Sequence, residues 1–366
     1  MNIIYKVIIA IIAILLIGIL GYQYLSTSQT QQPINLNGSG ATFPYPLLDA
    51  MAKQYQKQKT NVQINYQAIG SGGGISALEG KTVDFAASDA PLGASDRALA
   101  PNTLHIPETI GAVTLAYNLP GIQTGLHLTG NVLADIFAGN VTMWNDPEIQ
   151  SLNSNMTLPA KSILIVHRSD GSGTTFIFTG YLSASSATWK NAIGQGKSVA
   201  WPVGIGANGN TGVASVVQGT QYTIGYVELA YALQNNMTVA AIQNPAGNWV
   251  LPSLASTQTA TQSAASHGLQ AGDADWSKVD ILNAQDAQAY PIVSFTYLLV
   301  YKELNVIPGM TQAKATGLVQ FLWWVIHDGQ QNAPALAYAQ LPTNVVQIDE
   351  AAIQSITFNG QHLSTS

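Results

Sequence analysis

The sequence predicts an α/β fold with mostly parallel sheets, and three observations support this prediction. Short apolar runs alternate with helical patterns beyond residue 37. Charged residues make up only 9% of the 366 residues, whereas the hydrophobic share of 47% is that of an ordinary globular protein. Three turns rich in glycine, serine and threonine stand where a helix should begin. The chain is long enough for two domains of ordinary size.

The expected strands are short runs rich in β-branched and aromatic residues. They cover residues 62–67, 83–88, 111–118, 163–167, 223–227 and 292–302. The first helix follows Pro44, because proline is favoured at the first helical position, and runs toward Lys59. Further helices are expected at about 74–79, 129–137, 174–183, 211–218, 228–235 and 311–327. Residues 245–290 have a weak pattern, which indicates loop and irregular helix.

The N-terminal segment is the most apolar part of the chain. Val7–Gly21 contains no polar residue, and extending the run to residues 3–25 adds only Lys6 and Gln23 as strongly polar positions. Such a helix spans roughly 30 Å, the thickness of a bilayer core. Lys6 is the only charge on its N-terminal side, which indicates a cytoplasmic N-terminus and an exported remainder. We expect a membrane anchor in residues 1–25, and a cleaved signal peptide is the alternative.

Two further features belong to the exported part. Residues 26–37 are polar and are expected to form a tether. Sequons of the form Asn-x-Ser/Thr are possible glycan acceptors in an exported chain. They begin at Asn37, Asn140, Asn155 and Asn236.

The composition argues against several classes of function. The net charge is −6 and there is no basic run, whereas binding to a nucleic-acid backbone needs many Lys or Arg. The absence of cysteine excludes disulfides, thiolate metal sites and a lipid anchor on cysteine. The six histidines show no spacing typical of a metal site. We therefore expect no nucleic acid, no metal and no cofactor.

Three polar turns form a candidate anion site. They are Gly38–Pro44, Gly70–Gly74 and Asp170–Thr174. A helix N-terminus offers free N–H groups, glycine lets the backbone approach a ligand, and Ser or Thr adds a hydroxyl donor. Arg168, one of only two arginines, stands just before the third turn and could bind an oxyanion through its planar fork. Ordinary capping explains any one turn alone, but the three together favour an anion site.

Motifs for other chemistries fit poorly. Gly80-Lys81-Thr82 lacks the glycine that a Walker A loop needs five positions earlier, where Ile75 stands. Residues 72–77 match a relaxed form of the dinucleotide-binding motif. A lone match of this kind is weak evidence for a dinucleotide site, and a dinucleotide is an unexpected cofactor for an exported protein. Neither Ser71 nor Ser172 lies in a G-x-S-x-G motif. We interpret His167 and the pair Trp323-Trp324 as structural.

Six longer motifs resemble those of the substrate-binding protein of the ABC-type phosphate importer family. They read "GSGATFPYPLLDAMAKQYQKQ", "INYQAIGSGGGI", "VDFAASDAPL", "HRSDGSGTTFIFTGYL", "TIGYVELAYALQNN" and "ADWSK", in the family's order. The resemblance runs from about Asn37 to about Val346. It implies a type II periplasmic-binding-protein fold, in which two α/β lobes are joined by two chain crossings and hold the ligand between them.

The resemblance also implies how the lobes divide the chain. Lobe I would comprise residues 38–110 and 292–366, and lobe II would comprise residues 111–291. The chain would cross near Glu108–Ala112 and again near Tyr290–Val293.

The family's phosphate-binding residues match positions in this sequence. They are Thr42, Phe43, Ser71, Asp89, Arg168, Ser172, Gly173 and Thr174. Asp170 matches the residue that holds the arginine in place. Two positions depart from the family, because Gly72 stands where a second serine is common and His167 where a basic or apolar residue is common. Neither departure removes a matched contact.

Asp89 has a selective role in this interpretation. A carboxylate accepts a hydrogen bond from a phosphate that still carries a proton, whereas fully ionised sulfate has none to give. A buried acceptor facing another acceptor is penalised, so Asp89 would reject sulfate.

The resemblance implies binding of inorganic phosphate and delivery to ABC permease subunits, without catalysis. The protein would act as a monomer at the outer face of the cytoplasmic membrane, or be secreted if its N-terminal segment is cleaved. Three alternatives stay open: a binding protein for another oxyanion such as sulfate, a secreted serine hydrolase using Ser71 or Ser172, and a phosphate sensor without a transporter.

Overall fold

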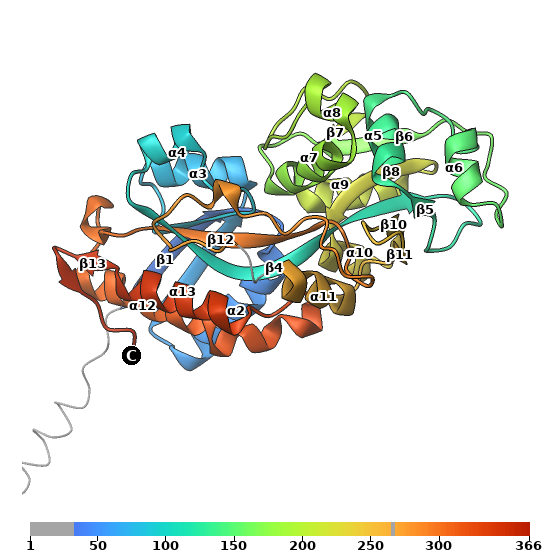
Figure 1. The fold of residues 1–366 in the computed structure, drawn as a ribbon. Helices are drawn as coiled ribbons and strands as arrows, with labels where there is room; N and C mark the ends of the chain where they lie inside the picture. The colour runs from blue at the N-terminus through green and yellow to red at the C-terminus, as the bar shows by residue number, and fades with distance from the viewer. Residues whose placement is uncertain (1–32, 265–267) are drawn as a thin grey trace, which may run out of the picture.

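The computed structural model describes residues 33–264 and 268–366 and divides into two halves joined by long strands (Figure 1). The anchor expected in residues 1–25, like residues 26–32 of the expected tether, lies outside the described residues. In the part that is described, no helix combines the length and the hydropathy needed to cross a bilayer.

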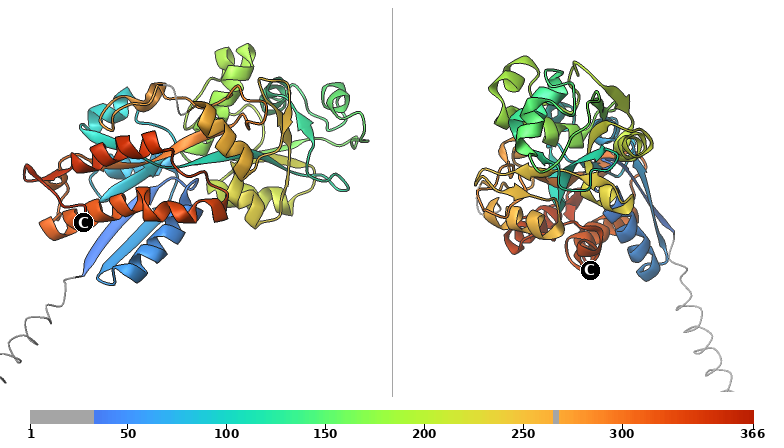
Figure 2. Two further views of the ribbon diagram at one scale, coloured as in Figure 1. Left: turned by 60° about the horizontal axis from the view of Figure 1, so that its bottom comes forward. Right: turned by 90° about the vertical axis from the view of Figure 1, so that its right-hand side faces the viewer.

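The first half is built from the two ends of the described chain (Figure 1). Its elements are β1 (Ile34–Gly40), α2 (Tyr45–Gln58), β2 (Val62–Ala68), α3 (Ser71–Glu79), β3 (Phe85–Ser88), α4 (Ala94–Leu99), β12 (Val293–Tyr301), η2 (Leu304–Val306), α12 (Gln312–Ile326), η3 (Asp328–Asn332), η4 (Pro334–Leu336), α13 (Thr343–Gln354), β13 (Thr357–Phe358) and β14 (Gln361–His362). Helices α2, α12 and α13 cover one face of its sheet, and α3 and α4 cover the other (Figures 1 and 2).

The middle of the chain forms the second half. Its elements are β5 (His127–Leu128), α5 (Gly130–Ala138), α6 (Pro147–Leu152), β6 (Leu164–Arg168), α7 (Gly173–Ser185), α8 (Ala187–Ala192), β7 (Ile205–Ala207), α9 (Gly209–Gly219), β8 (Thr223–Glu228), α10 (Leu229–Gln234), β9 (Thr238–Val239), β10 (Ala241–Gln243), β11 (Trp249–Val250) and α11 (Leu254–Ala264). The chain then returns through η1 (Trp276–Lys278), whose buried Trp276 packs against Tyr297 of the first half.

Strand β4 (Thr103–Asn118) belongs to both halves. Its first part, Thr103–Ala112, pairs antiparallel with β12, and its second part, Val113–Asn118, pairs antiparallel with β8. The half sheets thereby join in the order β2-β1-β3-β12-β4-β8-β6-β7, and β9 also pairs with β4. The outer pairs β1–β2, β1–β3, β6–β7 and β6–β8 are parallel. The prediction of mostly parallel sheets was wrong for the centre, because the chain leaves the first half along β4 and comes back along β12.

Most predicted elements have a counterpart within a few residues, but the tether was predicted too long. Ile34–Gly40 forms β1, so residues 34–37 are part of the sheet. The side chain of Leu36 is buried, whereas Asn35 and Asn37 are exposed, which is the alternation of a strand with one covered face. Residues 254–264, expected to be irregular, form the regular helix α11.

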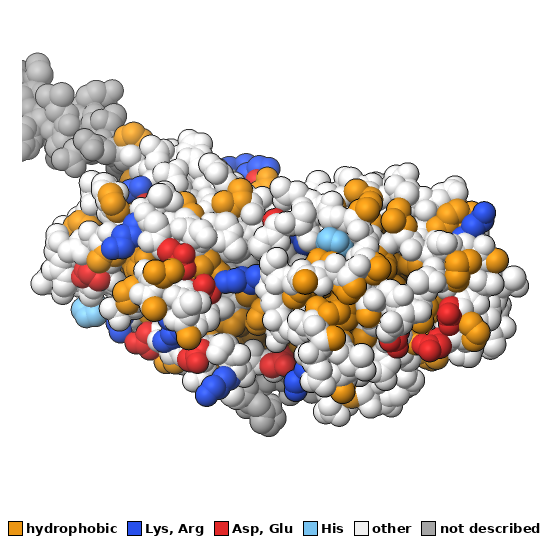
Figure 3. All heavy atoms as spheres, turned by 90° about the horizontal axis from the view of Figure 1, so that it is seen from above, with side chains coloured by type: hydrophobic (Ala, Val, Ile, Leu, Met, Phe, Trp, Pro, Cys, Tyr) orange, Lys and Arg blue, Asp and Glu red, His pale blue; other side chains and the backbone are white. Residues whose placement is uncertain are grey.

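The surface agrees with the low charge of the sequence. Seen from above, Lys and Arg are scattered among Asp and Glu, and most of this face carries neither charged nor hydrophobic side chains (Figure 3). The asparagines of the four sequons, Asn37, Asn140, Asn155 and Asn236, are all exposed. Trp324 is buried in the core as expected, and its neighbour Trp323 is partly buried against it.

Candidate functional site

Four helices begin where the two halves meet. Helices α2, α3, α7 and α9 follow closely on the carboxyl ends of β1, β2, β6 and β7, which is the edge of a parallel sheet where ligands bind. The halves touch directly here, because the backbone N–H of Gly72 donates to the carbonyl of Gly171 at 2.8 Å. The N–H of Gly173 donates to Ser71 Oγ at 3.1 Å. The polar turns singled out in the sequence therefore lie together.

Arg168 ends β6 and is only 3% exposed. Its guanidinium forms a two-pronged ion pair with Asp170: Nε donates to Oδ1 at 2.7 Å, and Nη2 donates to Oδ2. Its remaining nitrogen, Nη1, donates to Thr174 Oγ1 at 3.1 Å. Burial tends to raise the pKa of Asp170, but the hydrogen bonds and charge of Arg168 hold that pKa below its ordinary value. The pair therefore stays ionised at neutral pH, and Asp170 fixes the plane of the guanidinium.

Asp89 is the acceptor of the site. It follows β3, is 2% exposed, and its Oδ1 accepts from Thr296 Oγ1 at 2.9 Å. Ser71 Oγ lies 3.5 Å from its other oxygen. Burial raises the pKa of Asp89 to about 7, against the lowering effects of Thr296 and Arg168. Near neutral pH this carboxyl can therefore be either a pure acceptor or a donor.

Thr42 and Thr174 come from different halves and share one neighbour. Asn210, in the first turn of α9, donates from its backbone N to Thr42 Oγ1 at 3.2 Å and from its amide Nδ2 to the same oxygen at 2.9 Å. The same Nδ2 donates to Thr174 Oγ1 at 3.2 Å. The hydroxyl of Tyr231 donates to the Thr42 carbonyl at 2.6 Å. All of these residues are buried, so the two threonine hydroxyls are held in fixed positions.

Phe43 and Ser172 have mainly local roles in this arrangement. The Phe43 side chain is fully buried, and its carbonyl accepts from the Tyr338 hydroxyl at 2.6 Å. Ser172 is the N-cap of α7, and its Oγ accepts from the Thr175 N–H at 3.0 Å. Its hydroxyl oxygen thereby orients the start of the helix.

Two buried carboxyls lie near the site. Burial raises the pKa of Glu108 to about 8, and the charge of Asp89 adds to that rise. Burial also raises the pKa of Glu228 well above its ordinary range, although the Tyr338 hydroxyl, which donates to it at 2.9 Å, acts in the opposite direction. Both groups keep their protons at neutral pH, so they add little negative charge beneath the turns.

The arrangement suits a small tetrahedral oxyanion. It combines one buried guanidinium, several hydroxyls, the N-terminal ends of helices, and the buried acceptor Asp89. Such donors favour an anion, and the acceptor favours one that still carries a proton.

Asn210 and Thr296 are two of the residues that contact the predicted ones and were not themselves predicted. Asn210 stands just before the helix predicted at about 211–218. The start of that helix was not recognised as a fourth polar turn, although "GANGNTG" (residues 206–212) is also rich in glycine and in hydrogen-bonding side chains. Thr296 reaches Asp89 where the register between β12 and β4 shifts, between Thr296 and Tyr297. A bulge of this kind redirects a side chain and leaves no signature in a lone strand sequence.

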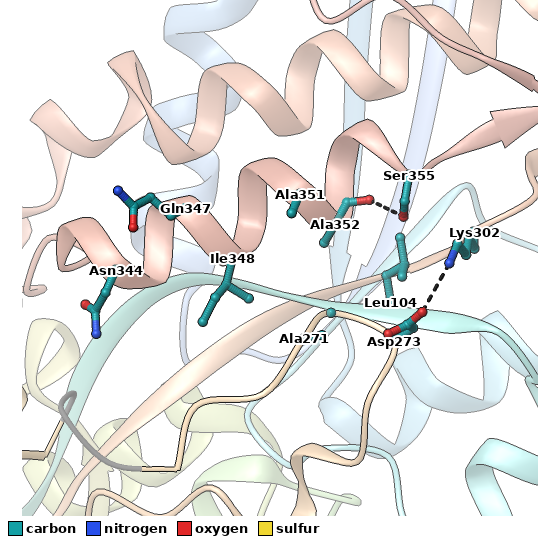
Figure 4. Close-up of a pocket in the computed structure, with 11 residues that line it drawn as sticks. Leu104, Ala271, Asp273, Lys302, Asn344, Gln347, Ile348, Ala351, Ala352 and Ser355 are labelled. Carbon is teal, nitrogen blue, oxygen red and sulfur yellow. Dashed lines mark hydrogen bonds and ion pairs between the residues drawn. The ribbon is translucent and has the colours of Figure 1, made fainter.

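A separate hollow lies against α13 (Figure 4), and none of its lining residues belongs to the polar turns. It has a volume of about 330 Å³, and several of its lining residues are aliphatic. Lys302 on its rim pairs with Asp273 at 3.1 Å, and Ser355 donates to the Ala352 carbonyl at 2.7 Å. These polar groups are paired with their neighbours, and the lining contains no helix N-terminus with serine or threonine hydroxyls like those where the two halves meet.

Comparison with known families gives a match over most of the chain. The model of the PBP superfamily domain matches residues 26–328. A protein of Xylella fastidiosa named phosphate-binding protein PstS is 45% identical over 332 residues, which cover 89% of this chain and 86% of the relative. The PstS protein of Methanocaldococcus jannaschii is 36% identical over 347 residues, covering 90% of this chain and 88% of the relative.

Solved structures share the fold at low sequence identity. A phosphate-binding protein from Stenotrophomonas maltophilia aligns with a TM-score of 0.67 at 17% identity, covering 87% of this chain and 93% of that one. A putative phosphate ABC transporter substrate-binding protein with bound phosphate, from Clostridium perfringens, aligns with a TM-score of 0.60 at 16% identity, covering 84% and 100%. The mixed α/β fold described above is the periplasmic-binding-protein fold.

Gly173 should be needed for the halves to approach. A Cβ at this position would lie 2.4 Å from Asp89 Oδ2 and 2.5 Å from Ser71 Oγ, closer than van der Waals contact allows. Gly173→Ala should therefore hold the halves apart, and small-angle scattering of residues 33–366 should give a larger radius of gyration than for the parent. Gly212→Ala is the matched control, because its nearest neighbour would be at 3.5 Å. Identical scattering from both variants would contradict this role.

Proposed function

The chain belongs to the phosphate-binding proteins of ABC-type phosphate importers, and on this premise we propose that its buried turns bind inorganic phosphate for delivery to an importer. Thr42, Phe43, Ser71, Ser172, Gly173 and Thr174 would supply donors, and Arg168 would supply the positive charge. Asp89 would accept the proton that phosphate retains, and Asp170 would orient Arg168.

The observation that carries this proposal is the coexistence of one buried cation and one buried acceptor among donors. Arg168 and Asp89 are each less than 4% exposed. Asp89 lies at the contact between Ser71 and Gly173, and Arg168 donates to Thr174, the residue after Gly173. Only a ligand that is at once an anion and a hydrogen-bond donor satisfies both groups. A partly protonated phosphate has that character.

Closure of two lobes would bury the ligand. The division into residues 38–110 plus 292–366 and residues 111–291 supports this motion, since Thr42, Ser71 and Asp89 would lie on lobe I and Arg168 with Ser172–Thr174 on lobe II. The pairing of β4 with both β12 and β8 supports a hinge at the same position, near Ala112.

Binding without catalysis agrees with the surroundings of the two serines. A serine hydrolase needs a base that takes the hydroxyl proton. His167, next to Arg168 in the chain, stacks on Trp201 with ring centroids 5.0 Å apart, and its Nδ1 faces the Arg168 carbonyl at 3.0 Å. It is therefore engaged away from Ser71 and Ser172. Among the proposed partners, permease subunits of the importer would receive the phosphate.

Replacing Arg168 should nearly abolish phosphate binding. Arg168→Ala removes the cation and leaves the Asp170 carboxylate, whose side chain is 12% exposed, without its counter-charge. The loss should be roughly thirty-fold to several thousand-fold in affinity, measured by calorimetry on the full chain in detergent. Arg97→Ala is the matched control, because Arg97 is the only other arginine and donates to the Asp273 and Ala274 carbonyls. Equal phosphate affinity in both variants would remove Arg168 from the site.

Replacing Asp89 should change selectivity more than affinity. Asp89→Asn removes a negative charge and supplies an amide that can donate, so sulfate is no longer rejected. We expect the variant to keep much of its phosphate affinity and to bind sulfate more tightly than the parent, in paired titrations at one pH and salt concentration. Asp84→Asn, a buried aspartate that pairs with Lys314, is the control. A variant that still ignores sulfate would show that Asp89 does not select the ligand.

The selectivity should also depend on pH. The pKa of Asp89 is raised to about 7, so the carboxyl gains its proton as pH falls through that value and can then donate to sulfate. Sulfate affinity of the parent should rise from about pH 8 to about pH 6, and sulfate itself does not titrate in this range. In Asp89→Asn the sulfate affinity should be flat, although Glu108 still titrates. A flat profile in the parent would contradict this assignment.

The N-terminal segment would hold the protein at the outer face of the cytoplasmic membrane. We expect full-length protein in the membrane fraction with its first residues retained, because Val7–Gly21 is long and uninterrupted. N-terminal sequencing of that fraction checks this. A sequence that starts near Ser26–Gln32 would leave export but exclude the anchor.

A further inference from the structure

Asn210, which was not among the predicted site residues, forms hydrogen bonds to Thr42 of the first half and to Thr174 of the second. It is fully buried in the first turn of α9. Its Oδ1 accepts from the backbone N–H of Glu228 at 3.0 Å. That N–H can only donate, so the side-chain atom facing it must be the oxygen. The amide nitrogen is thereby aimed at Thr42 and Thr174.

The two threonine hydroxyls have both acceptor positions occupied. Thr42 Oγ1 accepts from Asn210 N and from Asn210 Nδ2. Thr174 Oγ1 accepts from Asn210 Nδ2 and from Arg168 Nη1. A hydroxyl oxygen has two lone pairs, so each group has only its proton left to use. Within residues 33–264 and 268–366, neither proton is directed to a protein acceptor.

We propose that Asn210 is a positioning residue for anion binding, which orients the hydroxyls of Thr42 and Thr174 so that both can only donate to the ligand. This inference rests on the proposed phosphate site. Asn210 would not itself touch the anion. A hydroxyl that is free to rotate could present its lone pairs to the ligand and repel it, whereas these two present protons without a reorientation cost.

Ser71 provides an internal comparison. Its Oγ accepts from the backbone N–H groups of Asp89 and Gly173, at 3.2 and 3.1 Å. Backbone groups therefore fill both of its acceptor positions, and its own proton is directed to Asp89 Oδ2, 3.5 Å away. At Thr42 and Thr174 the side chain of Asn210 fills one acceptor position of each hydroxyl. Because Thr42 lies in the first half and Asn210 in the second, the Thr42 hydroxyl is oriented only when the halves meet.

The test is calorimetry with inorganic phosphate on the full chain in detergent. Asn210→Ala should weaken phosphate binding roughly tenfold to a hundredfold, since two hydrogen bonds to a charged ligand become disordered. Asn208→Ala is the control at the same helix start, because Asn208 is exposed and its side chain makes no capping hydrogen bond. Its phosphate affinity should equal that of the parent.

A double-mutant cycle separates positioning from a merely structural role. In a Thr42→Val background, Asn210→Ala should cost much less affinity than in the parent, because the hydroxyl that it orients is already gone. An equal loss in both backgrounds, or an unchanged affinity on Asn210→Ala, would overturn the proposal.

Asn210→Asp covers the case in which the alanine variant fails to fold. It keeps the size of the side chain and an acceptor for Glu228 N, but it loses the amide that donates to both threonines, and its carboxylate, when ionised, would draw the threonine hydroxyls toward itself. It should bind phosphate more weakly than the parent by at least the loss expected for alanine, with thermal unfolding of the ligand-free protein as the check on folding. Parent-like phosphate binding by this variant would overturn the proposal. If the parent itself does not bind phosphate, the proposed function fails first.

Discussion

The ion pair between Arg168 and Asp170 is the interaction on which the site depends. A guanidinium that is 3% exposed needs a partner, because a buried lone charge is strongly destabilising. Asp170 accepts hydrogen bonds from two nitrogens of this guanidinium and a third from the N–H of Gly209 at 3.1 Å. The pair also dictates its surroundings, since a Cβ on Gly70 would lie 2.2 Å from Asp170 Oδ2. Glycine at that turn therefore leaves room for the charge pair, and it also suits the positive φ of 87° at Gly70.

The direction in which the hydroxyl groups donate is a second property of the site, and it explains how one cation among the proposed contacts could be enough to bind an anion. The chain places one cation among the proposed contacts and gives it a full counter-charge, so net charge contributes little to attraction. Selectivity would come instead from the direction of each O–H bond, which is set by neighbours that occupy the oxygen lone pairs. A buried site of oriented hydroxyls would lose less affinity in salt than an open basic patch.

Features encoded within one stretch of chain were predictable, whereas those that depend on pairing between distant segments were not. Arg168, Asp170 and the start of α7 form one local motif, and the helix starts after β1, β2 and β6 have turn residues of their own. Asn210 meets Thr42 only because two halves come together, and Thr296 meets Asp89 only through a register shift. The strand at 34–40 was missed because its polar residues resemble a tether until its partner β2 is known.

The shared strand also constrains the order in which the protein can fold. β4 is synthesised early. Its first part, Thr103–Ala112, which belongs to the first half, pairs with β12, which lies much nearer the C-terminus. A chain that emerges from its N-terminus therefore carries an unpaired edge while the whole second half is made, and such an edge invites wrong pairing. Native assembly of the first half can be completed only after the second half has emerged. A truncated chain that stops before β12 should accordingly need a chaperone to stay soluble, because its first half cannot complete its sheet.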